Sequence, residues 1–252
     1  MPGQKSRSSN PLHVLSSRLP SHWGFRWPGL DMLSGLVLLL ITVHLLLLGA
    51  GGPSEAPWYY QNFGLSWGEF SHGKIWQLIT HGLLHGDWFH LSINVLVLWL
   101  VGWRVVEILG TWKCFQIILC GALAGGVLHL FTGILMLRTG YIESYLVGIS
   151  GACLALLLTL TTLMPYSRLW LLPVSGKNLG LGIMMAELLL WLMHPGLGLP
   201  VFCRLGEQLI RWGGPGIFQI SHACHLGGAL AGWWIARKLL TTIPDRKSSL
   251  GR

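Results

Sequence analysis

A serine and a histidine stand at the starts of two different apolar segments of this 252-residue chain. Ser150 lies between two glycines in "GISG", directly before a leucine-rich run, and His225 begins "HLGGALAGWW". A serine hydroxyl becomes a good nucleophile only when a base takes its proton, and histidine is the usual base because its pKa lies near neutral pH. The pair therefore predicts nucleophilic catalysis at a carbonyl group, with Ser150 as nucleophile and His225 as general base.

Attack on a peptide carbonyl produces an oxyanion, which hydrogen-bond donors in fixed positions must stabilise. The segment "HLSIN" places His90 and Asn94 four residues apart, so both side chains lie on one face of a helix. We expect these two side chains and the backbone N–H of Ser150 to form the oxyanion hole.

No acidic residue has a spacing that places it beside His225. Glu187 lies in another apolar segment, and Glu107 lies near the end of a third. The sequence therefore predicts a Ser–His dyad without an acidic third member. The motif also differs from the G-x-S-x-G turn of soluble α/β-hydrolases, because Ala152 occupies the position of the second glycine.

The composition indicates which elements carry these residues. Hydrophobic residues make up 52% of the chain and charged residues 10%, whereas soluble domains carry about 25% charged residues. Apolar runs of about 20 residues are typical of membrane helices. We therefore expect an all-α membrane protein with six transmembrane helices and a short fourth helix. The predicted spans are 31–50, 86–103, 114–136, 149–164, 179–194 and 218–237.

The distribution of positive charge predicts the orientation of these spans. With six spans, 13 of the 17 Lys and Arg residues fall on the side that holds both termini. That side is predicted to be the cytoplasm by the positive-inside rule, which also accounts for the net charge of +8 without a nucleic-acid partner. No removable signal peptide is expected. We predict a basic tail at 1–28, a membrane domain at 29–240 and a second basic tail at 241–252.

Three of the polar residues are expected at a similar depth in the membrane. The 15 residues from Ser150 to the cytoplasmic end of its span cover about 22 Å, because an α-helix rises about 1.5 Å per residue. This is shorter than the hydrocarbon core of about 30 Å, so Ser150 should lie below the outer surface, in protein or in a water-filled cavity. The same count gives about 21 Å for His90 and about 18 Å for His225.

Two glycines share the helix face of His225. Gly228 and Gly232 follow it at positions i+3 and i+7. Small residues let membrane helices approach closely. We therefore expect the sixth span to contact the fourth and to bring His225 within reach of Ser150.

These motifs, in this order, resemble those of the rhomboid intramembrane serine proteases in their bacterial six-helix form. The matching residues are Gly148, Ser150 and Gly151 of "GISG", His90 and Asn94 of "HLSIN", and His225, Gly228 and Gly232 of "HLGGALAG", with His81 and His85 in the preceding "THGLLHGDWF". The resemblance covers about residues 30–240. It implies a rhomboid-like bundle around a short central fourth helix, and it implies the catalytic and oxyanion roles given above.

The resemblance also implies an activity and a location. The substrates would be single-pass membrane proteins, cleaved in or near their transmembrane segment after lateral entry past the second and fifth spans. The protein would lie among the lipids of a bacterial inner membrane and would need no metal or cofactor; its oligomeric state is not indicated. Leu154 stands where bacterial relatives often have a tyrosine that stacks on the catalytic histidine, and Trp76-Gln77 replaces a Trp-Arg pair.

Other roles stay open for the same residues. Ser150 could serve as a helix N-cap, His225 as a buried structural histidine, and His90 with Asn94 as an interhelical hydrogen-bonding pair. His222 precedes His225 by three residues and is a second candidate for the base.

Two other functions are also open. The pairs His81-x-x-x-His85 and His222-x-x-His225 are similar to the histidine boxes of membrane di-iron oxygenases, which makes a metalloenzyme an alternative. An inactive rhomboid-like protein that binds membrane segments is another. Otherwise we expect His81 and His85 to be structural or to order water, and the five cysteines to be buried apolar residues.

Overall fold

The apolar runs of the sequence form helices in the computed structural model. The structure describes residues 31–52, 58–141, 144–167 and 174–242. These residues contain no strand beyond one isolated antiparallel bridge between Leu65 and Leu146. The fold is therefore all-helical, as predicted. The predicted tail at 1–28 and nearly all of the tail at 241–252 lie outside the described residues.

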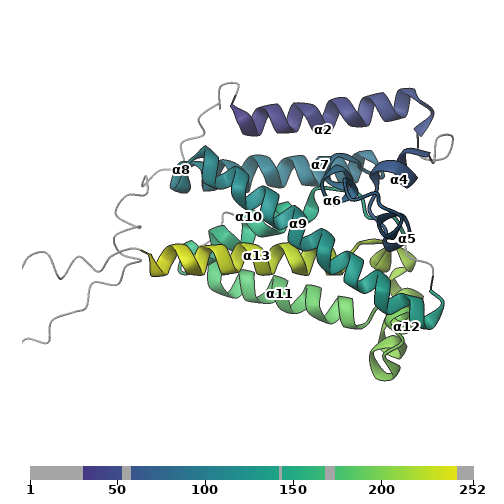
Figure 1. Cartoon of the computed structure of the whole chain (residues 1–252). Helices are drawn as coiled ribbons and strands as arrows, with labels where there is room; N and C mark the ends of the chain where they lie inside the picture. Colours follow the sequence, from purple (N-terminus) through teal and green to yellow (C-terminus); the bar gives the residue numbers. More distant parts are fainter. Residues whose placement is uncertain (1–30, 53–57, 142–143, 168–173, 243–252) are drawn as a thin grey trace, which may run out of the picture.

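Seven helices form the body of the bundle (Figure 1). They are α2 (Met32–Gly49), α7 (Trp88–Val97), α8 (Trp103–Leu109), α9 (Thr111–Met136), α10 (Ser150–Leu163), α11 (Gly176–Leu192) and α13 (His222–Thr241). The other described helices are α4 (Trp58–Phe63), α5 (Trp67–Ser71), α6 (Gln77–Thr80), η1 (His81–Leu83), η2 (Leu98–Gly102), η3 (Leu137–Thr139), η4 (Pro195–Leu197), α12 (Pro200–Gly213) and η5 (Pro215–Gln219). The start of α2 and the end of α13 lie at the same end of the bundle (Figure 1).

Three helical runs of the described chain are long and apolar enough to cross a membrane. They are Met32–Gly49, Trp88–Leu109 and Thr111–Thr139, and Ser150–Leu163 is a shorter apolar helix. Several leucines on the outer face of α2 are exposed, among them Leu38, Leu45 and Leu46. Exposed leucines on an apolar helix are typical of a surface that faces lipid. The chain is an integral membrane protein.

Several helix boundaries differ from those predicted: α9 begins at Thr111, α11 begins at Gly176, and α13 ends at Thr241. Two further differences have a clear local cause. The second apolar helix continues beyond residue 103 to Leu109, because the π-helical turn η2 joins α7 to α8 without a break. Gly110, with a φ of 85°, then turns the chain directly into α9. The last helix begins at His222 rather than at 218, because the 3₁₀-helix η5 occupies Pro215–Gln219 and the Ser221 hydroxyl caps α13 by accepting from the Cys224 N–H at 3.2 Å.

Helix α10 lies in the middle of the bundle, packed against α9 and α13 (Figure 1). Eleven of its 14 residues are buried. Its contact with α13 depends on glycine: a Cβ added to Gly228 would overlap the Gly151 carbonyl, and one added to Gly232 would overlap the Ala155 carbonyl. The backbones of α10 and α13 are therefore in direct contact at the first turns of α10.

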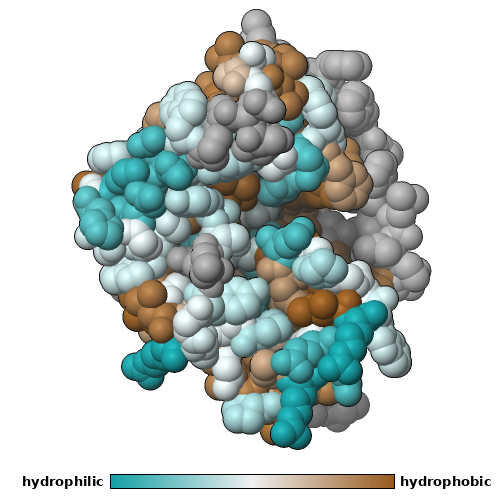
Figure 2. Space-filling view, turned by 90° about the vertical axis from the view of Figure 1, so that its right-hand side faces the viewer, coloured by the Kyte–Doolittle hydropathy of each residue, from teal (hydrophilic) through white to brown (hydrophobic). Residues whose placement is uncertain are grey.

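Residues 58–85 form short helices at the end of the bundle where α10 and α13 begin. Side-chain hydrogen bonds hold this segment together. Trp76 Nε1 donates to the Asn62 carbonyl at 2.8 Å, and Gln77 Nε2 donates to the Gln61 carbonyl at 2.9 Å. Gln77 is thus fully buried as an anchor of α6. Figure 2 looks onto this end and shows hydrophilic and hydrophobic residues intermixed, as expected for a surface outside the hydrocarbon core.

Candidate active site

Ser150 is the first residue of α10, and the chain before it is held in an unusual conformation. Gly148 has a φ of 106°, and a Cβ at this position would lie 2.6 Å from His90 Nε2. The Gly148 N–H donates to the His81 carbonyl at 2.9 Å. Glycine is therefore required at position 148 for two reasons: the positive φ angle and the close approach of the His90 ring. Ser150 does not act as the N-cap, because Ile149 occupies that position and no side chain caps α10.

Ser150 and His225 form a hydrogen-bonding pair between α10 and α13. The Ser150 Oγ lies 2.8 Å from His225 Nε2, although the two residues are 75 positions apart. His225 is the fourth residue of α13, on the glycine face that packs against α10. His222 does not take this place: its ring nitrogens meet Glu187 and the Ile217 carbonyl instead. Of the two candidate bases, His225 is the one beside Ser150.

An acidic residue also contacts His225, contrary to the sequence prediction. The Glu187 Oε1 lies 3.0 Å from His225 Nδ1, on the side of the ring opposite to Ser150. The prediction failed because it needed the rotation of α11 relative to α13, which hydropathy does not determine. A signal was available, since Glu187 is the one acidic residue of the apolar helix α11, and ionisable residues in such helices often mark functional sites. Glu107 pairs instead with Arg104 on α8.

His90, Asn94, Ser150 and His225 line a common cavity of about 460 Å³. Asn94 is 2% exposed, and its Nδ2 has no hydrogen-bond partner among the described residues. An unpaired buried donor costs free energy unless some acceptor reaches it. The cavity therefore combines a hydroxyl, an adjacent imidazole and an unused amide donor, the groups that acyl transfer requires.

His81 and His85 surround this site without lining the cavity. His81 is buried, and its Nδ1 lies 2.8 Å from the Gln77 carbonyl. Its own carbonyl holds Gly148, so His81 supports the loop before Ser150. His85 is also buried, with its ring centroid 5.1 Å from that of His90 in an edge-to-face contact. Both histidines thus support residues of the site: the His81 carbonyl holds Gly148, and the His85 ring packs against His90.

Leu154, one turn after Ser150, lines the cavity and is partly buried. It supplies no aromatic ring to His225. The aromatic contact recorded for His225 is with His222, at 6.3 Å between ring centroids and perpendicular. The His225 ring is held by its hydrogen bonds to Ser150 and Glu187 rather than by stacking on α10.

Glu187, His222 and His225 are the group of the described chain that could hold a metal ion, with potential ligand atoms within 4.8 Å of one another. Carboxylate and imidazole are suitable zinc ligands. His81 and His85 are not members of this group, so the two histidine boxes suggested by the sequence do not come together as one site. The same nitrogen and oxygen atoms are already hydrogen-bonded to one another, His222 and His225 each to one oxygen of Glu187.

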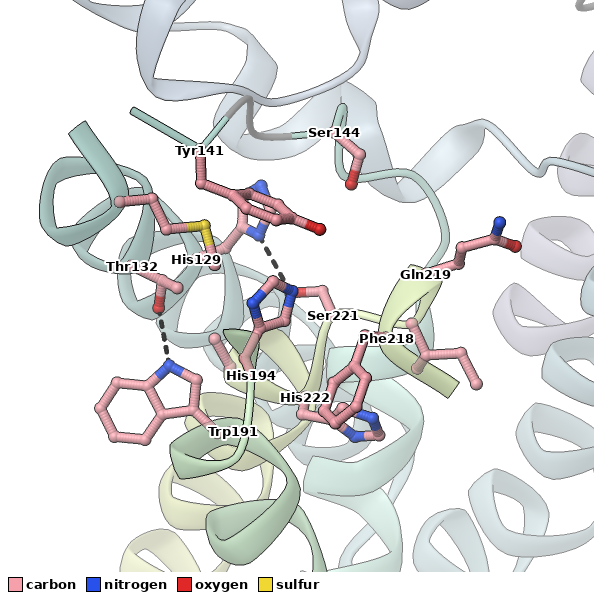
Figure 3. Close-up of a pocket in the computed structure, with 13 residues that line it drawn as sticks. His129, Thr132, Tyr141, Ser144, Trp191, His194, Phe218, Gln219, Ser221 and His222 are labelled. Atoms are coloured by element: carbon pink, nitrogen blue, oxygen red, sulfur yellow. Dashed lines mark hydrogen bonds between the residues drawn. The ribbon is translucent and has the colours of Figure 1, made fainter. Parts of the chain in front are cut away.

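A second, smaller cavity of about 140 Å³ lies beside His222 (Figure 3). Tyr141, His194 and Phe218 surround it, with centroid distances of 5.3 Å from His194 to each of the other two rings. His222 contributes to its wall and is 7% exposed. The two cavities adjoin, because five residues line both of them: His129, Ser144, Gln219, Ile220 and Ser221.

Known proteins match most of this chain. A family model described as the Rhomboid domain matches residues 72–242. "Rhomboid protease GlpG" of Photorhabdus laumondii is 29% identical over 185 residues, which is 69% of this chain and 57% of that protein. "Rhomboid protein 1, mitochondrial" of Saccharomyces cerevisiae is 25% identical over 223 residues, 86% of this chain and 58% of that protein. "Rhomboid protease GlpG" of Serratia proteamaculans is 27% identical over 160 residues, 59% of this chain and 54% of that protein.

This chain spans less than two thirds of the length of these three relatives. The family match itself covers more than half of the chain; it begins directly after α5 and includes all of α13. It includes the residues that line the larger cavity and the helices that carry them. The chain therefore belongs to the rhomboid family.

Proposed function

We propose that this protein is an intramembrane serine endopeptidase in which Ser150 is the nucleophile and His225 the general base. The observation that carries the proposal is the 2.8 Å distance between Ser150 Oγ and His225 Nε2 at the wall of a cavity. Burial supports it, because Ser150 is 9% exposed and the site is sheltered from bulk water. The names of the bacterial relatives, which are proteases, agree with this chemistry.

The reaction follows from the positions of these groups. The Ser150 Oγ attacks the carbonyl carbon of the scissile bond while its proton passes to His225 Nε2. The carbonyl oxygen becomes an oxyanion, which accepts hydrogen bonds from the Ser150 N–H, the His90 ring and Asn94 Nδ2. His225 then gives its proton to the leaving amine, and an acyl-enzyme forms. A water molecule, deprotonated by His225, hydrolyses the ester and restores Ser150.

The proposed membrane arrangement has six crossings. They are α2, the run from α7 to α8, α9, α10, α11 and α13. Helix α10 has 14 residues, or about 21 Å at 1.5 Å per residue, so Ser150 lies below the outer surface at the centre of the bundle. Six crossings put both termini on one side, which is the cytoplasm by the excess of positive charge there. The membrane domain spans 29–240, with basic tails at 1–28 and 241–252, in a bacterial inner membrane.

The proposed substrates are single-pass membrane proteins, cut in or near their transmembrane segment. The cavity around Ser150 is bounded by α7 on one side and by the segment 216–221 before α13 on the other. Its lining is mainly apolar, with Phe89, Ile93 and Val97 contributed by α7. A substrate would enter from the lipid past α7 and α11, and no cofactor takes part.

The test is cleavage of a generic transmembrane substrate by the purified protein in lipid. Ser150→Ala and His225→Ala are expected to abolish cleavage. The matched control changes are Ser71→Ala, at the last residue of α5, and His72→Ala, at the residue after it. Both control residues are exposed, and both variants should retain cleavage. Cleavage that survives Ser150→Ala or His225→Ala contradicts the proposal. A chelator is expected to leave the rate unchanged, and a rate that depends on added iron or zinc would favour a metalloenzyme instead.

A further inference from the structure

A chain of hydrogen-bonding groups extends beyond the Ser150–His225 pair into α11. From Ser150 Oγ it passes through both nitrogens of His225 to Glu187, with distances of 2.8 and 3.0 Å. From the second oxygen of Glu187 it continues to His222 Nδ1 at 2.7 Å, and from His222 Nε2 to the Ile217 carbonyl at 2.9 Å. Every polar atom of the two imidazoles and of the carboxylate has a partner in this chain.

The partners determine where the hydrogens lie. The Ser150 hydroxyl can donate to His225 Nε2 only if that nitrogen is bare, so the ring carries its hydrogen on Nδ1 and donates it to Glu187 Oε1. The Ile217 carbonyl only accepts, so His222 carries a hydrogen on Nε2. One proton remains for the contact between His222 Nδ1 and Glu187 Oε2. Whichever atom holds it, the His222–Glu187 pair is neutral overall, and Oε1 stays an acceptor for His225.

Overall neutrality explains how a carboxylate can stay in this place. The side chain of Glu187 is 16% exposed and that of His222 7% exposed. An unpaired charge at such a site would be strongly disfavoured, whereas a paired and fully hydrogen-bonded one is tolerated. His222 therefore holds Glu187 in place, and Figure 3 shows the His222 ring at the second cavity.

We propose that Glu187 is a positioning residue that holds His225 in the tautomer and orientation needed to take the Ser150 proton. The site is then a Ser150–His225–Glu187 triad rather than a dyad, and His222 neutralises the third member. The inference rests on the proposed function of Ser150 and His225. It also accounts for Leu154: without an aromatic ring on α10 to stack on His225, the carboxylate on α11 fixes the imidazole.

Two substitutions separate the contributions of Glu187. Glu187→Leu removes both the acceptor and the charge, while Glu187→Gln keeps an amide oxygen that can accept from His225 Nδ1–H and an amide N–H that can donate to His222. In serine proteases, loss of the orienting carboxylate lowers kcat by about 10⁴-fold. We expect Glu187→Leu to lower kcat by about 10²- to 10⁴-fold. Glu187→Gln should lower it by about tenfold, because a hydrogen bond to a charged group is about twice as strong as a neutral one.

The experiment measures kcat, KM and the melting temperature of each variant with the same transmembrane substrate in lipid. The expected result is a loss in kcat with a KM within about threefold of the wild type, because Glu187 acts on the base and not on the substrate. Glu207→Leu and Glu207→Gln on α12 are the matched controls, since the described contact of that side chain is with Cys203. Both controls should keep wild-type kcat.

Several results would overturn the proposal. If the folded Leu and Gln variants both have wild-type kcat, Glu187 has no positioning role. If both lower the melting temperature equally and leave kcat of the folded protein unchanged, its role is structural only. If the Leu variant does not fold, a wild-type kcat in Glu187→Gln alone contradicts the proposal. Cleavage that persists in Ser150→Ala would instead show that the proposed function itself is wrong.

Discussion

Glu187 and His225 lie 38 positions apart in the chain and meet at 3.0 Å between Oε1 and Nδ1, which links α11 to α13 beside Ser150. The link also involves His222, whose Nδ1 contacts the other carboxylate oxygen at 2.7 Å. Two helices of the bundle are thus joined by one carboxylate at the level of His225. This arrangement makes the stability of the fold and the orientation of the proposed base depend on the same side chain.

The coupling between Glu187 and His222 can be measured in a double-mutant cycle of Glu187→Leu and His222→Leu. Each single change leaves a buried partner without its hydrogen bond and is expected to destabilise by about 3–5 kcal/mol. The double change should cost less than the sum, by about 1–3 kcal/mol. Denaturant unfolding in detergent measures all four free energies. The pair of Glu69 and Lys74, at 2.7 Å and with side chains 29% and 25% exposed, is the control and should show a coupling below about 1 kcal/mol. Additive effects at Glu187 and His222 would mean that the pair does not interact.

Asn94 is predicted to act in catalysis and not in stability. Its Nδ2 has no partner among the described residues, so Asn94→Ala removes no hydrogen bond of that nitrogen. Loss of one oxyanion donor lowers kcat by about 10²- to 10³-fold in related chemistry. We expect a similar fall with KM and melting temperature little changed. An unchanged kcat would remove Asn94 from the oxyanion hole.

Gly228 is predicted to be essential for the contact between α10 and α13. A Cβ at this position would overlap the carbonyl of Gly151, which directly follows Ser150 in the first turn of α10. We expect Gly228→Ala to destabilise by about 1–3 kcal/mol and to lower activity, because α13 must move away from Ser150. Gly182→Ala on α11 is the control, since nothing lies within 4 Å of the added methyl group. That change should be neutral or stabilise by up to about 1 kcal/mol. Equal melting temperatures for the two variants would contradict the close packing.

Glu69 gives a prediction for pH, because it lies outside the membrane helices. Its hydrogen bond and ion pair with Lys74 hold the pKa of the Glu69 carboxyl below the usual value of 4.5. A lowered folded-state pKa stabilises the fold above about pH 4.5, and this contribution is lost as the pH falls through the folded-state pKa. The side chain is 29% exposed, so we expect less than about 1 kcal/mol. Melting temperatures of the wild type and Glu69→Gln should differ at pH 7 and converge at pH 3. A constant difference would contradict the ion pair.

Much of the bundle could be predicted from the sequence because long apolar runs leave few alternatives to membrane helices. The start of α10 near Ser150 and the glycine face of α13 could also be predicted, since both depend on local sequence spacing. The start of α13 was not predicted, because the 3₁₀ turn at Pro215–Gln219 is apolar enough to resemble the helix that follows. Nor was the continuation to Leu109, where a polar Arg104 suggested a loop although it pairs with Glu107 within the helix.

The pairing of Ser150 with His225 was predictable and the contact of His225 with Glu187 was not, for a physical reason. Ser150 and His225 stand at helix starts with flanking glycines, so spacing and depth point to both. The contact of Glu187 with His225 depends on how α11 is rotated in the bundle, which only tertiary packing sets. The available signal was the lone carboxylate of Glu187 in an apolar helix. A charge in a membrane helix is costly unless it is paired, so a partner for Glu187 could be expected.

Covalent labelling of Ser150 tests whether His225 activates it as a nucleophile. A serine-directed fluorophosphonate probe is added to the wild type, Ser150→Ala and His225→Ala in lipid, and the adduct is located by mass spectrometry. We expect an adduct on Ser150 of the wild type and none in Ser150→Ala. In His225→Ala the labelling rate should be lower by about 10²-fold or more, the range in which a positioned general base contributes. Labelling of another residue, or equal rates with and without the His225 imidazole, would contradict this expectation.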